Sequence, residues 1–146
     1  MKNRVTILTI SVLTIMVLGG MAFNNSEPES QELHTIMRLL MLDIHTINEG
    51  IYTQNYDLIE TGAANINDHA PLADESRQLV METLGDRMSA FGDFDDLVHS
   101  RADSIRMAAI NRDMGKVLEQ YRIVEQGCVN CHAAFQDEIL KARLQN

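Results

Sequence analysis

The chain has 146 residues, a length typical of one domain. It contains 21 acidic and 12 basic residues, so its formal net charge is −9 at pH 7. This charge argues against nucleic acid and against an anionic membrane surface as partners, because both would repel it. It suits partner proteins that carry basic docking patches.

Residues 1–22 have the layout of a secretory signal peptide. Lys2 and Arg4 form a short basic start, and residues 5–18 are apolar apart from hydroxyl side chains. Small residues follow, and we expect cleavage after Ala22. Cleavage would export the rest of the chain, most simply to a bacterial periplasm. It would also make the charge two units more negative, since both basic residues are removed.

An uncleaved membrane anchor is the alternative for the same segment, because the apolar stretch 5–23 is just long enough to span a bilayer. The protein would then be held at the membrane, with its folded part outside the cytoplasm. In either case residues 23–31 are expected to form a polar linker, and residues 32–146 one domain.

The first half of this domain is expected to form two helices, because its apolar residues recur at steps of three and four. The first helix begins near Leu33 and ends within residues 50–55. Its expected inward-facing residues are Leu33, Met37, Leu40, Ile44, Ile47 and Ile51. The second helix runs from Tyr56 to Asp68 and stops before Pro71, since the residue that precedes a proline disfavours helix.

Residues 71–92 are the least regular part, and we interpret them as a long crossover between the second and third helices. A short helix is expected within residues 73–88, with Asp74 as its cap. Gly85 and Gly92 are expected to interrupt it, because glycine is a poor helix former.

Two longer helices follow. The third is expected from Asp93 to Ile110, and Asp113 is expected to cap the fourth. The inward-facing residues of the fourth are Val117, Tyr121, Val124, Cys128, Cys131, Phe135, Ile139 and Ala142. Four such helices predict an all-α fold, an antiparallel four-helix bundle. The chain has no tryptophan and only 5% aromatic residues, so the core is thin and leaves room for something other than side chains.

The only two cysteines, Cys128 and Cys131, are followed directly by His132. All three face one side of the fourth helix. A redox dithiol of this spacing usually lies at a helix N-terminus, whereas these cysteines lie in mid-helix. A zinc site needs four ligands, or three and a water, and no further cysteine is present to complete one.

Cys-x-x-Cys-His is also the attachment sequence of c-type haem. The thiols add covalently to the vinyl groups of the haem, and the histidine becomes the proximal ligand of the iron. We therefore predict one covalently attached haem c, with Cys128 and Cys131 as its anchors and His132 as the proximal ligand.

The fourth helix further resembles that of the cytochrome c-prime superfamily. The residues that carry the resemblance are Tyr121, Gly127-Cys128-Val129-Asn130-Cys131-His132, Phe135, and the helical pair 33–68 that ends before His69-Ala70-Pro71. The resemblance implies a four-helix bundle with the haem attached near the C-terminal end of the last helix. It also implies a distal residue donated by the first helix. The chain departs from the family at Gln136, where an arginine or lysine is common.

The distal residue decides the function that this resemblance implies. Members with an apolar side chain there bind small gases at five-coordinate iron, and members with methionine are low-spin electron carriers. The candidates in the first helix are His34, Met37, Met41 and His45. Met37 faces inward near the start of this helix, which an antiparallel arrangement places beside His132. Met37 is therefore expected as the second axial ligand, with Met41 as the alternative and His45 on the outer face.

These expectations combine into a periplasmic monohaem c-type cytochrome that carries single electrons between redox partner proteins and is not an enzyme. Its iron is expected to be ligated by His132 and Met37. The first alternative is a c-prime-like protein that binds nitric oxide or carbon monoxide at an open or displaceable sixth position. The second is a thiol redox or zinc protein without haem.

Other side chains are assigned to less specific roles. His69 and His99 are expected at surface or capping positions, with nothing nearby to complete a metal site. Tyr121 is expected to pack on the haem edge. Arg38 and Arg122 are interpreted as surface charges rather than as partners of the haem propionates.

Ile36, Leu39 and Leu42 make the first helix apolar beyond its inward face. This additional stripe is expected either to pack on the crossover or to be buried in a homodimer. Some members of the c-prime superfamily dimerise through their first helices.

Overall fold

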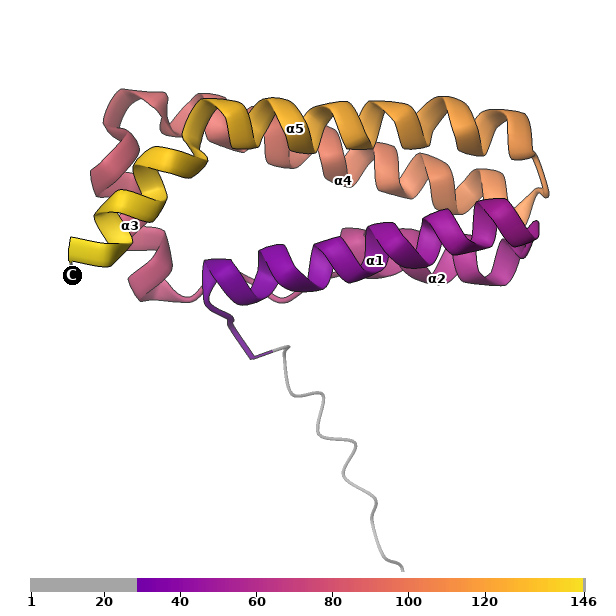
Figure 1. Ribbon diagram of the computed structural model, residues 1–146, viewed down its shortest axis with the longest axis horizontal. Coiled ribbons are helices and arrows are strands. Elements are labelled where there is room, and N and C mark those ends of the chain that lie inside the picture. Colours follow the sequence, from indigo (N-terminus) through magenta and orange to yellow (C-terminus); the bar gives the residue numbers. More distant parts are fainter. Residues whose placement is uncertain (1–28, 146) are drawn as a thin grey trace, which may run out of the picture.

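The computed structural model describes residues 29–145, so the expected signal peptide or anchor and most of the linker lie outside the described residues. The helices are α1 (Leu33–Thr53), α2 (Tyr56–Asn67), α3 (Asp74–Leu84), α4 (Met88–Ile110) and α5 (Met114–Gln145), with a 3₁₀ turn at Gly85–Arg87 (Figure 1). Within residues 29–145 the fold is all helical, as predicted, and no strand is present. No helix of this part is long and apolar enough to cross a membrane.

Four helices pack together: α1 lies along α2, α2 along α4, and α4 along α5 (Figure 1). The start of α1 and the end of α5 lie toward the same end of the molecule, where α3 packs on α5. The segment before α1 is tied to the connection before α3. The backbone N–H of Gln31 donates to the carbonyl of Pro71 at 2.9 Å, and the N–H of Ala73 donates to the carbonyl of Gln31 at 2.8 Å.

The end of α3 and the start of α5 follow from local chemistry, whereas the start of α3 lacks the predicted cap. Asp74, the predicted cap of α3, lies instead in its first turn, and Ala73 precedes it without a side-chain cap. Gly85 does end α3, with a φ of 52° in the left-handed region that glycine favours. Asp113 caps α5 as predicted, because its Oδ1 accepts a hydrogen bond from the N–H of Lys116 at 2.9 Å.

The predicted start of α4 is wrong. The helix begins at Met88 rather than near Asp93, and it continues through Gly92. One glycine inside a helix costs only about 1 kcal/mol relative to alanine. The flanking Phe91 and Phe94 pack against buried residues of α3 and α5, and this contact outweighs the local preference.

The core consists of two separate clusters of buried side chains. The first core cluster contains Ile47, Ile59, Ala63, Ile66, Ala102, Ile105, Ala108, Ala109, Val117, Tyr121 and Val124. The second core cluster contains Val80, Leu84, Phe135 and Ile139. Small alanine and valine side chains let the helices approach closely in the first, whereas aromatic contacts characterise the second, in which Phe91 and Phe94 meet Phe135 edge to face.

The additional apolar stripe of α1 is only partly covered by the chain itself. Ile36 is buried, whereas Leu39 and Leu42 are 37% and 56% exposed. The described residues therefore leave these two leucines facing solvent.

Glycines allow α1 and α2 to lie in close contact. A Cβ on Gly62 would lie 2.8 Å from the carbonyl oxygen of Asp43 and 2.8 Å from Cγ1 of Ile47. A Cβ on Gly50, in the last turn of α1, would lie 2.9 Å from the backbone nitrogen of Ile59. All three distances are too short for a carbon atom, so the two helices could not keep this separation with any other residue at these positions.

We predict that Gly62→Ala destabilises the protein by about 1–3 kcal/mol, because the new methyl group would overpack the contact between α1 and α2. Gly92→Ala is the matched control, since a Cβ at that position of α4 meets nothing within 4 Å. It should stabilise the protein by about 0.5–1 kcal/mol through helix propensity alone. Urea unfolding followed by circular dichroism measures both changes. Equal effects of the two variants would contradict the close packing of α1 on α2.

Candidate cofactor site

A cavity of about 960 Å³ lies between α1, α3, α4 and α5. Its volume is at the upper end of the range of about 300–1,000 Å³ that is usual for sites of small molecules and cofactors. Figure 1 shows that the first half of α1 and the second half of α5 lie on either side of this region, with α3 at its end. The described structure therefore contains a space large enough for a cofactor.

The cavity separates the two core clusters. Its lining includes Leu40, Ile44, Val98 and Cys128, which pack against the first core cluster. It also includes Leu33, Phe91, Phe94 and Cys131, which pack against the second. Apolar side chains from both clusters thus face a common space that no side chain fills.

The Cys-x-x-Cys-His motif lies on the wall of this cavity. Cys128, Cys131 and His132 all line it from the middle of α5, so the prediction of a mid-helix position is confirmed. Both cysteines are half-buried free thiols, and His132 is exposed. The preceding Gly127 lets α4 approach closely, because a Cβ there would lie 3.2 Å from Cγ2 of Val98.

Burial raises the pKa of both thiols above its ordinary value. The nearby charge of Glu125 adds to this effect at Cys128, and the charges of Cys128 and Asp95 add to it at Cys131. Redox-active thiols need the opposite shift, a lowered pKa that favours the thiolate. Within residues 29–145, these thiols and His132 also do not form a cluster of converging metal ligands. The raised pKa of the two thiols therefore does not favour the redox dithiol.

Met37 lines the same cavity from α1, together with His34 and Met41. His45 does not line it, in agreement with its expected position on the outer face. Met37 is 36% exposed and Met41 is 57% exposed, so Met37 is the better covered of the two thioethers. The structure thus brings Met37 and His132 to one cavity, although they are far apart in the sequence.

One part of the cavity wall, formed by α3 and the first turn of α4, was not identified from the sequence. α3, interpreted there as part of a crossover, contributes Glu75, Ser76 and Leu79, and α4 contributes Phe91. The spacing of Phe91 and Phe94 was a helical signal, but Gly92 between them obscured it. The orientation of α3 depends on its contacts with α5, which no local pattern reveals.

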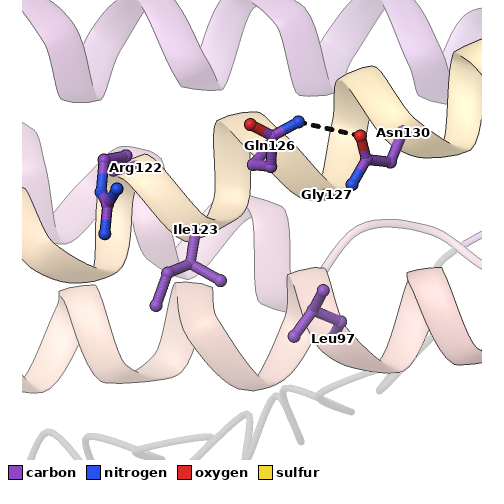
Figure 2. Close-up of a pocket in the computed structure, with 6 residues that line it drawn as sticks. All are labelled: Leu97, Arg122, Ile123, Gln126, Gly127 and Asn130. Atoms are coloured by element: carbon purple, nitrogen blue, oxygen red, sulfur yellow. Dashed lines mark hydrogen bonds between the residues drawn. The ribbon is translucent and has the colours of Figure 1, made fainter.

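Two arginines line the cavity: Arg38 of α1 and Arg143 in the last turn of α5. The first was interpreted as a surface charge, and the second was not recognised. Arg122 lines a separate hollow of about 250 Å³ instead, together with Leu97, Ile123, Gln126, Gly127 and Asn130 (Figure 2). Tyr121 belongs to the first core cluster and does not line the large cavity, and its burial raises its pKa to about 12.

His69 and His99 form a pair that was not predicted, and the expectation that nothing nearby completes a metal site is wrong. Their Nε2 atoms lie 3.0 Å apart, and Oδ1 of Asp95 lies 3.7 Å from Nε2 of His99. Within residues 29–145 these three side chains form a group whose ligand atoms could hold a metal ion. The i, i+4 spacing of Asp95 and His99 was a signal for part of it. His69 follows α2 and is distant in sequence.

No model of a protein family, no characterised protein and no solved structure matches this chain. The resemblance to the cytochrome c-prime superfamily therefore rests on the motif residues of α5 and the helical pair 33–68 alone, and the functional argument rests on the cavity and its lining.

The raised thiol pKa predicts slow alkylation of the haem-free protein. Because burial disfavours the thiolate, the reaction rate should rise at a higher pH than it does for an unstructured cysteine peptide. The rate of iodoacetamide reaction between about pH 7 and pH 10 measures this. The variants Cys128→Ser and Cys131→Ser separate the two thiols, and the same protein in urea is the control without burial. A transition below that of the peptide would contradict the prediction and support a redox dithiol.

Proposed function

We propose that the chain is a periplasmic monohaem c-type cytochrome, an antiparallel four-helix bundle that carries single electrons. The observation that supports this best is the common cavity. The motif residues Cys128, Cys131 and His132 face the same large apolar space as Met37. Haem attachment needs two thiols and a histidine beside a space of this kind.

Each of these residues has a defined role in the proposal. The S–H groups of Cys128 and Cys131 would add across the two vinyl groups of the haem and so anchor it to α5. His132, directly after the second cysteine, would bind the iron as proximal ligand. Met37 would supply the second axial ligand from α1. When bound, the haem supplies a one-electron ferric–ferrous couple.

The rest of the cavity suits the two ends of a haem. Phe91, Phe94 and Phe135 line the cavity and would exclude water from one face of a bound porphyrin. Arg38 and Arg143 would pair with the propionates, because guanidinium groups form strong hydrogen bonds with carboxylates. An apolar pocket and a thioether ligand both favour the ferrous state and raise the reduction potential, which suits an electron carrier.

The partners in this proposal are redox proteins rather than substrates. The formal charge of −9, which cleavage on export would make two units more negative, would steer the protein toward a basic docking patch, and this attraction weakens as salt screens it. No residue is assigned a catalytic role.

A c-prime-like protein that binds nitric oxide or carbon monoxide is the second candidate. The observation that favours it is the exposure of Met37, of which 36% stays accessible. A thioether that is only loosely held could be displaced from the iron by a gas molecule.

We predict that the protein binds one haem covalently when it is produced with haem-attachment machinery. The Soret band should stay with the protein after denaturation and solvent extraction, because two thioether bonds hold it. In Cys128→Ser combined with Cys131→Ser the band should be extracted completely. Loss of the band from the unaltered protein would contradict the whole proposal.

We further predict that Met37→Ala opens the iron to carbon monoxide. The unaltered protein should show low-spin bands when reduced and a weak methionine-to-iron band when oxidised. Met37→Ala should lose the second and bind carbon monoxide when reduced, whereas Met41→Ala, the matched control in the same cavity, should behave like the unaltered protein. If only Met41→Ala opens the iron, Met41 is the ligand. If the unaltered protein already binds carbon monoxide readily, the gas-binding candidate is supported.

A further inference from the structure

The hydrogen bonds of the His69–His99 pair determine which nitrogen of each ring carries a proton. Nδ1 of His69 lies 2.8 Å from the carbonyl oxygen of Ala70, and Nδ1 of His99 lies 3.1 Å from that of Asn67. A carbonyl oxygen only accepts, so both Nδ1 atoms must donate. In a neutral imidazole the other nitrogen is then an acceptor. The two Nε2 lone pairs therefore face each other across 3.0 Å.

Two lone pairs at this distance repel each other unless a cation lies between or beside them. We propose that His69, His99 and Asp95 form a binding site for a divalent transition-metal ion such as Zn²⁺. The ligand set, two imidazole nitrogens and a carboxylate oxygen, is one that such ions prefer. Metal-binding histidines also commonly donate their second N–H to a backbone carbonyl, as both rings do here.

The separation of the two histidine nitrogens is close to that of an open tetrahedral site, and the Asp95 oxygen lies somewhat farther away, 3.7 Å from Nε2 of His99. Two nitrogens at 2.0–2.1 Å from one tetrahedral ion lie about 3.3 Å apart, close to the 3.0 Å between the two Nε2 atoms. All three ligand atoms lie within 4.8 Å of one another. Three protein ligands leave the fourth position to a water molecule, and the exposed side of Asp95 gives that water access.

Asp95 and His99 belong to α4, and His69 belongs to the connection after α2. A metal ion bound by all three would therefore link this connection to α4. Asp95 also lines the large cavity, so the metal site and the cavity share one wall.

The test uses the intact protein, from which a chelator has first removed any bound metal, and zinc is then added. Isothermal titration calorimetry should show one zinc ion bound per chain. The variants His69→Ala and His99→Ala should each lose at least about tenfold in affinity, because even outer-shell partners contribute that much. His45→Ala, which removes an exposed histidine of α1, is the matched control and should bind like the unaltered protein. Calcium and magnesium, which prefer oxygen ligands, should not compete.

A second measurement identifies the ligands and does not depend on the haem proposal. Zinc K-edge absorption should show nitrogen and oxygen at about 2.0–2.2 Å and no sulfur at about 2.3 Å. Zinc should also raise the melting temperature of the unaltered protein and of His45→Ala, but not of the two histidine variants. Each variant is compared with its own metal-free form, so a variant that is merely less stable still gives a result.

Three outcomes would overturn the proposal. Sulfur ligands would place the ion at Cys128 and Cys131. Unchanged binding in both histidine variants would place it elsewhere on the surface. No saturation below about 1 mM zinc would mean that a shared proton, rather than a metal ion, separates the two rings.

Discussion

The structure depends on a core that its own side chains do not close. Alanine and valine residues bring the helices together in the first core cluster, and phenylalanine residues do so in the second. Between the clusters lies an apolar cavity of about 960 Å³. Cys128 and Cys131 line it from α5, and Met37 lines it from α1. A large apolar group bound between the clusters would make dispersion contacts with both of them, and the proposed haem is such a group.

The chemistry of the motif agrees with this constraint. Burial, together with nearby acidic charge, raises the pKa of the Cys128 and Cys131 thiols, which is opposite to the shift that redox-active thiols need. Charged side chains of both signs lie at the lining: Arg38 and Arg143 are cations, and Asp95 is an acidic residue that also belongs to the group with the histidine pair.

The sequence predicted helix boundaries correctly where local signals determine them. It predicted them wrongly where packing between helices determines them. The three-and-four spacing of α1, the proline after α2 and the cap at Asp113 are local signals, and the structure has these helices. The start of α4 was misplaced because Phe91 packs against α3 and α5 strongly enough to carry the helix across Gly92. The cavity position of Arg143 and the pairing of His69 with His99 depend on which helices are neighbours, and a single sequence does not contain that information.

The two core clusters do not share all their helices. α2 contributes only to the first and α3 only to the second, whereas α1, α4 and α5 run without a break past both. The walls of the cavity are therefore held at each end by packed side chains and between the ends by continuous helical hydrogen bonds. The conformational entropy of these walls is lost when the chain folds. A group that enters the cavity meets ordered walls, and its binding energy is not reduced by the cost of arranging them.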